Sequence, residues 1–193
     1  MKKVLAFIMV LLPMLACAQV VGTFSNRLAK RNDLTVQLLK KDNKPYYVCF
    51  DAQTKRGYGE VWVKYKDLAK FRQALIDARS KYVEWSQVAD ANNVKNFRKE
   101  IPVKFPKPIY CWEIAGDRFY DDYTGWKMTF SATKNNRFAF MLSETKDMNN
   151  RYITENYEIV FSCVEDFNSL IDLLDPAKVD AVVGDPVDES LFK

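Results

Sequence analysis

A change in the spacing of apolar residues limits the folds open to this chain. Between residues 68 and 89, apolar side chains recur at intervals of three and four, the spacing of one face of an amphipathic helix. The positions are Leu68, Phe71, Leu75, Ala78, Tyr82, Trp85 and Ala89. Polar residues occupy the opposite face. The pattern therefore predicts a helix that begins after the N-cap Asp67 and packs with its apolar side against a sheet.

On both sides of this helix the period changes to two, which is typical of antiparallel strands with one buried face. Before the helix, the segments 34–38, 46–52 and 59–65 predict a three-stranded meander. After it, strands are predicted at 110–114, 126–133, 138–142 and 157–161, followed by a second amphipathic helix capped by Asp166. We therefore expect an α+β protein with antiparallel sheet and two main amphipathic helices packed on one face.

The remaining segments predict connections. Residues 19–33 are mixed and are expected to be an entry segment, and residues 117–126 and 144–156 to form a turn and a polar loop. The basic stretch 95–99 and the three prolines between residues 102 and 108 predict a connector. Asp175-Pro176 predicts the end or the restart of the second helix.

A shift of 99 residues aligns the two parts of the chain, pairing Val61 with Val160 and Leu75 with Leu174. The match fits either a duplicated strand–strand–strand–helix unit or the pattern that any strand–helix junction produces. We expect a single domain over residues 19–193, with halves at 19–100 and 101–183 and a loose acidic tail over 184–193.

The N-terminus has the parts of a secretory signal peptide: Lys2 and Lys3, an apolar run over residues 4–15, and the small-residue site Ala16-Cys17-Ala18. The run is too short to span a bilayer. Cleavage would remove residues 1–18, leave 175 of the 193 residues, and lower the formal net charge from +4 to +2. The predicted location is the periplasm or the cell exterior, and a lipid anchor on Cys17 is the alternative.

Three cysteines remain after cleavage, Cys49, Cys111 and Cys163, each within an apolar strand-like stretch. An odd number allows at most one internal disulfide. We expect buried, inert thiols, because free cysteine often packs as a small apolar residue.

The absence of histidine removes Ser-His-Asp and Cys-His nucleophile systems, His-ligated zinc and proximal-His haem. Paired carboxylates are the remaining route to catalysis, and Glu60, Glu113, Glu144 and Glu158 lie in or beside predicted strands. No glycine-rich phosphate loop and no calcium-loop spacing occur. We therefore expect no cofactor, no metal and, on balance, no enzymatic activity.

The densest candidate for ligand binding is the segment 117–126, a turn rich in aromatic rings and carboxylates. Such a loop can stack on a sugar while its carboxylates accept hydrogen bonds from hydroxyls. Ordinary turn chemistry and core packing of the tryptophan are the alternatives. The candidate ligand-binding residues are Arg118, Tyr120, Asp121, Asp122, Tyr123 and Trp126.

These observations favour an exported binding domain for a protein or glycan partner. The alternatives are a small carboxylate-based hydrolase that acts on an extracellular polymer, and a structural or inhibitory module that docks through a sheet edge. Export and the low net charge argue against nucleic acid, although basic and aromatic residues mix in the connector: Lys95, Phe97, Arg98, Lys99, Lys104, Phe105 and Lys107. The signal and the Tyr-, Phe- and Lys-rich body resemble small exported proteins of Gram-negative bacteria.

Overall fold

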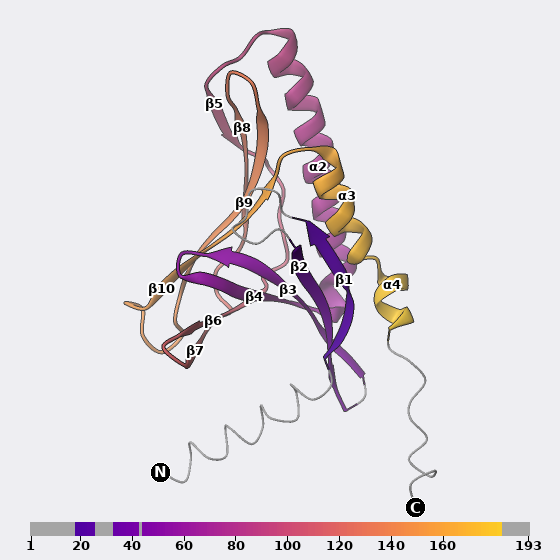
Figure 1. The fold of residues 1–193 in the computed structure, drawn as a ribbon, viewed down its shortest axis with the longest axis vertical. Helices are drawn as coiled ribbons and strands as arrows, with labels where there is room; N and C mark the ends of the chain where they lie inside the picture. The colour runs from indigo at the N-terminus through magenta and orange to yellow at the C-terminus, as the bar shows by residue number, and fades with distance from the viewer. Residues whose placement is uncertain (1–17, 26–32, 43, 183–193) are drawn as a thin grey trace, which may run out of the picture.

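The structure, a computed structural model, describes residues 18–25, 33–42 and 44–182. These residues form a twisted antiparallel sheet of ten strands with the long helix α2 along one face (Figure 1). The strands are β1 (Gln19–Ser25), β2 (Asp33–Lys41), β3 (Lys44–Thr54), β4 (Gly57–Lys64), β5 (Phe97–Glu100), β6 (Ile109–Ile114), β7 (Asp117–Asp121), β8 (Lys127–Ala132), β9 (Arg137–Lys146) and β10 (Thr154–Phe161). The predicted α+β architecture is confirmed.

Two three-stranded meanders form most of the sheet, β2–β3–β4 and β8–β9–β10. The first leads through a 3₁₀ turn (Tyr65–Asp67) into α2 (Leu68–Ala91), and the second leads into α3 (Val164–Leu173). The strand–strand–strand–helix unit therefore occurs twice, while a common origin of the two units stays a prediction.

The two meanders join at β3, which is eleven residues long. Most of one edge of β3 pairs with β2, but its last two residues, Gln53 and Thr54, pair with β10. The strand order is thus β5-β8-β9-β10-β3-β4-β6-β7, with β2 and then β1 branching from β3. This branch brings segments about a hundred residues apart into contact.

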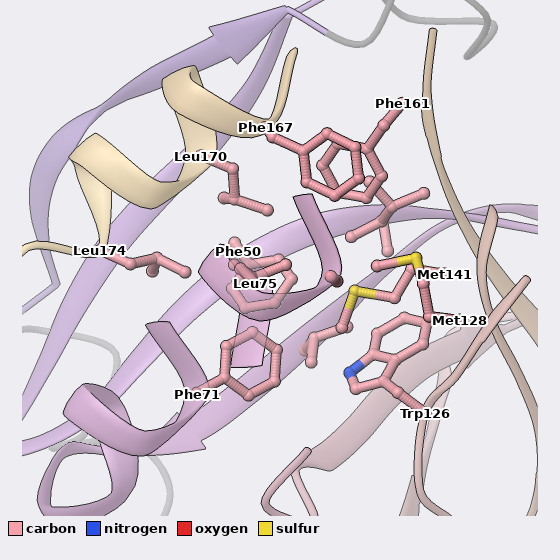
Figure 2. Packing of buried hydrophobic residues seen from close by; sticks show 14 of the residues in the cluster. Phe50, Phe71, Leu75, Trp126, Met128, Met141, Phe161, Phe167, Leu170 and Leu174 are labelled. Carbon is pink, nitrogen blue, oxygen red and sulfur yellow. The ribbon is translucent and has the colours of Figure 1, made fainter. Parts of the chain in front are cut away.

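The core lies between the sheet and the helices. The apolar face of α2 is buried, as its spacing predicts, and Phe71 of α2 lies 5.8 Å from Phe50 of β3 between ring centroids. At the β10–α3 corner, Phe161 and Phe167 stack with centroids 4.1 Å apart (Figure 2). Burial of these side chains is the main source of stability.

Tyr82 fixes the middle of α2 to the sheet. Its hydroxyl is positioned to donate a hydrogen bond to the carbonyl oxygen of Ser162 at 3.0 Å or of Arg137 at 3.2 Å. Burial raises the pKa of Tyr82 to about 12, so the hydroxyl keeps its proton at neutral pH.

Three strands lie where the sequence predicts connections. β1 lies in the leading segment, β5 in the basic connector and β7 in the predicted turn. Among the described residues, β1 pairs only with β2, β5 only with β8 and β7 only with β6. Edge strands need neither two partners nor strict alternation, which is why a period of two does not reveal them.

The loop and helix boundaries also need correction. The predicted polar loop over 144–156 is shorter, because β9 continues to Lys146 and β10 begins at Thr154. Asp67 occupies the N-cap of α2 but makes no side-chain hydrogen bond there. The N-cap of α3 is Cys163, and Asp166 lies inside the first turn.

The helix restart is confirmed: α4 (Pro176–Ala181) follows Asp175, whose carboxylate accepts a hydrogen bond from the Ala177 amide. Searching the described residues for a helix long and apolar enough to cross a membrane finds none.

Candidate functional site

The six predicted ligand-binding residues do not share one surface. Tyr123 is 70% exposed, and Arg118 and Asp122 are also exposed. Asp121 and Trp126 are buried, with exposed fractions of 1% and 6%. The segment 117–126 is therefore part strand, part turn and part core.

Trp126 belongs to the main core. Its ring lies 5.3 Å from that of Tyr110 on β6 in an edge-to-face arrangement, and Figure 2 shows it beside Met128 and Met141. A ligand could reach this ring only if the core opened.

Asp121 organises the turn after β7. One carboxylate oxygen accepts hydrogen bonds from the amides of Tyr123 and Thr124, and the other accepts from Thr124 Oγ1 and from the Lys146 amide. Burial alone would raise the pKa of Asp121, but these bonds hold it below its usual value. The side chain is saturated by its own protein and has no oxygen left for a ligand.

Tyr120 lies on the opposite face of the sheet from the main core, in a small second cluster. Its ring is 5.8 Å from Trp62, which in turn is 5.7 Å from Tyr47. Cys49 and Cys111 complete the buried part of this cluster. Burial, together with the neighbouring Cys111, raises the pKa of Tyr120 to about 12, so this group is a neutral packing element.

The thiols of this cluster are free and unreactive. Burial raises the pKa of Cys111 to about 12 and that of Cys49 well above its ordinary value, and the carboxylate of Glu60 acts in the same direction. The two residues lie on β3 and β6 with β4 between them. Two strand spacings exceed the Cα separation of about 7 Å that a disulfide tolerates.

A cleft of about 690 Å³ opens beside the loop, where β10 joins β3. Thr124 and Gly125 of the loop line it. Four side-chain positions in register across β8, β9, β10 and β3 form one row along it: Lys127, Leu142, Glu158 and Gln53. Glu144 and its partner Asn156 form the next row, and Lys55 follows from the β3–β4 turn.

The charged groups of the cleft are available to a ligand. Within the described part of the chain, Lys55, Lys127, Glu144 and Glu158 form no salt bridge. Two lysines and two glutamates leave the cleft without net charge.

The edge of the cleft is stabilised by Glu155, a residue that sequence analysis did not identify. Glu155 is 1% exposed, and its carboxylate accepts hydrogen bonds from the amides of Lys55 at 2.6 Å and Asn156 at 3.0 Å. It thereby fastens the β3–β4 turn to β10. An acidic residue at an inward position of a strand was the available signal, since an acid is rarely buried without partners.

The structure brings together two of the four carboxylates considered for catalysis. Glu144 lies opposite Asn156, and Glu158 is two positions further along β10, so the two acids are diagonal neighbours on one face. Glu60 accepts a hydrogen bond from Trp62 Nε1 at 2.9 Å, and Glu113 lies 3.9 Å from Arg118 on the β6–β7 hairpin. Neither of these lines the cleft.

Metal coordination has no support in the described ranges, where no group of three or more His, Cys, Asp or Glu side chains could hold an ion.

Comparison of the chain with protein-family models, with curated proteins and with solved structures finds no match.

Proposed function

We propose that the chain is an exported, non-enzymatic domain that binds a neutral glycan in the cleft between β3, β8, β9 and β10. The observation that carries the proposal is the set of four charged side chains without salt-bridge partners, beside the amide of Asn156. Sugar hydroxyls both donate and accept hydrogen bonds, so they can satisfy ammonium, carboxylate and amide groups in one site. Equal numbers of opposite charges favour a neutral ligand over a polyanion.

Tyr123 supports a glycan over other polar ligands. It directly precedes Thr124, which lines the cleft, and the residue is 70% exposed. An exposed aromatic face beside polar groups suits a sugar, which presents an apolar face and a rim of hydroxyls. Of the six predicted residues, Tyr123 is the one that we assign to ligand contact.

Binding of neutral oligosaccharides, measured by titration calorimetry, tests this function. We expect E144Q/E158Q to lower the affinity of the best ligand at least about tenfold, which corresponds to about 1.4 kcal/mol. E84Q, on the exposed face of α2, is the matched control and should bind like the unmodified protein. If no oligosaccharide of the panel binds, or if E84Q weakens binding equally, the proposal fails.

Export is supported by the N-terminal sequence and by the start of the fold. β1 begins at Gln19, directly after the predicted cleavage site, so cleavage would leave every described strand and helix whole. Mass spectrometry of the protein from the producing cell should give the mass of a chain beginning at Gln19. A diacylglyceryl group on Cys17 would instead establish a lipid anchor.

A carboxylate-based hydrolase is the second candidate, favoured by the diagonal placement of Glu144 and Glu158. Diagonal neighbours across two strands place carboxyl groups within the range of about 5–9 Å found in glycosidases. Cleavage of a bound oligosaccharide that both E144Q and E158Q abolish would establish it. Binding without cleavage would leave the binding domain as the function.

A further inference from the structure

An apolar groove of about 290 Å³ lies between the C-terminal part of α2 and the edge strand β5. Val88 and Phe97 on its rim are 54% and 44% exposed. The inner wall is aromatic, with Trp85 5.8 Å from Phe130. The groove is lined by Trp85, Val88, Ala89, Val94, Phe97, Lys99 and Phe130.

The edge of the sheet beside this groove is open among the described residues. β5 pairs with β8 along one side only, and all four of its residues are exposed. An extended peptide added to the other side would continue the sheet, and every second side chain would point toward α2 and the groove. The place is therefore shaped for a strand that presents apolar residues, and an acid beside Lys99, toward the groove.

The charge of this edge decides what kind of strand fits. Lys95, Arg98 and Lys99 are basic and Glu100 is acidic, so the edge is positive on balance. The two strand cations lie over aromatic rings, Lys99 Nζ 5.0 Å from the Trp85 centroid and Arg98 Cζ 5.5 Å from that of Phe140. Pairing β5 with the β5 of a second copy would bring these like charges together. An acidic strand is favoured instead.

The chain itself contains a segment of this chemistry. Residues 184–193, outside the described residues, include Asp185, Asp188 and Glu189. In a strand, Asp185, Val187, Glu189 and Leu191 would share one face, and Asp188 would lie on the other. We propose that residues 184–193 of a second copy add to β5 as a strand, with Val187 and Leu191 in the groove, Glu189 between them beside Lys99, which lines the groove, and Asp188 on the other face beside Arg98.

The tail of the same copy is too short for this role. α4 is fixed near the start of α2, where the Tyr65 hydroxyl donates to Asp180 and Arg72 lies 2.9 Å from Asp175. From Tyr65 to Val88 the helix rises about 35 Å, and Figure 1 shows α4 and β5 near opposite ends of α2. Residues 183–193 span at most about 40 Å when fully extended, so within one copy they would be used up in reaching β5.

A labelled peptide of residues 184–193, titrated with the purified protein in a fluorescence anisotropy experiment, tests the proposal. We expect saturable binding that weakens with added salt and falls at least about tenfold for V88D. V20D, the same change at a valine 60% exposed on β1, is the control and should bind the peptide normally.

Peptide variants keep the test independent of folding. D188K/E189K should reduce binding strongly, and a scrambled peptide of the same composition should bind weakly. Equal binding of the scrambled peptide, equal loss in V88D and V20D, or no binding at all would overturn the proposal. In sedimentation velocity, the full chain should associate with rising concentration, whereas a chain ending at residue 183 should stay monomeric; association of both to the same extent would also contradict it.

Discussion

At the centre of the sheet, one glycine makes room for one tyrosine. Tyr157 of β10 is fully buried and reaches past β3 and β4 to donate a hydrogen bond to the carbonyl oxygen of Cys111 on β6. A Cβ atom on Gly59 of β4 would lie 2.2 Å from the Tyr157 hydroxyl oxygen. Burial raises the pKa of Tyr157 far above its usual value, so the hydroxyl keeps the proton that it donates in this hydrogen bond.

We predict that Gly59→Ala lowers the free energy of unfolding by about 1–3 kcal/mol, because the tyrosine ring must move within a packed core. Gly125→Ala is the control, since no atom lies within 4 Å of its added Cβ. Urea denaturation compares the two variants with the unmodified protein. Equal stability of G59A and G125A would contradict this, because it would mean that the Tyr157 side chain can adopt another position without loss of stability.

Among the elements, β7 is joined to the end of β9 and the residues after it by hydrogen bonds, one to a carboxylate and one between backbone groups. Asp121 at the end of β7 accepts from the Lys146 amide at the end of β9 at 2.7 Å, and the Met148 amide donates to the Tyr120 carbonyl oxygen at 3.1 Å. The edge strand β7, far from β9 in strand order, is thereby held against it. Because the pKa of Asp121 is lowered in the folded state, this link contributes stability above the unfolded pKa of about 3.9 and loses it as the pH falls through the folded pKa.

We predict that Asp121→Asn lowers the free energy of unfolding at pH 7 by about 1.5–3 kcal/mol, because the new amide group faces backbone N–H donors. The difference from the unmodified protein should shrink as the pH falls below about 4. Asp122→Asn, one residue on and exposed, should stay within about 0.5 kcal/mol at every pH. A pH-independent loss in D121N would contradict a role for the charge.

For the whole molecule, the first strand closes the fold on the side of α3. β1 pairs with β2, Phe24 of β1 is 3% exposed in the main core, and Gly22 lies close under Leu173 of α3. β1 thus links the branch of the sheet to the second helix, although it begins directly after the predicted signal peptide.

We predict that a chain beginning at Gln19 folds cooperatively. A shorter chain that also lacks residues 19–25, the whole of β1, should have a Tm lower by about 10 °C or more. Loss of Phe24 alone is expected to cost about 3–5 kcal/mol, and each kcal/mol is worth about 2–4 °C in a chain of this size. Differential scanning calorimetry compares the two chains. A similar Tm for both would mean that β1 is not part of the cooperative core.

Sequence reasoning located the candidate loop but not the cleft beside it. Tyr123 and the acids Glu144 and Glu158 were recognised as residues of interest, whereas Lys55 and Lys127 were not. Strand parity indicates which face a side chain occupies but not which strands are neighbours. Nor does it reveal that the Asp121 carboxylate accepts hydrogen bonds from backbone amides and from the Thr124 hydroxyl.

By itself, the sequence determined the local elements: α2, the two meanders and the restart at Asp175, because hydrophobic period and turn chemistry act over a few residues. Only the tertiary structure decided that β3 changes partner at Gln53, that Glu155 fastens the turn at Lys55 a hundred residues away, and that three further strands form at edges. Pairing between distant segments depends on how the whole core packs, and no local pattern records it.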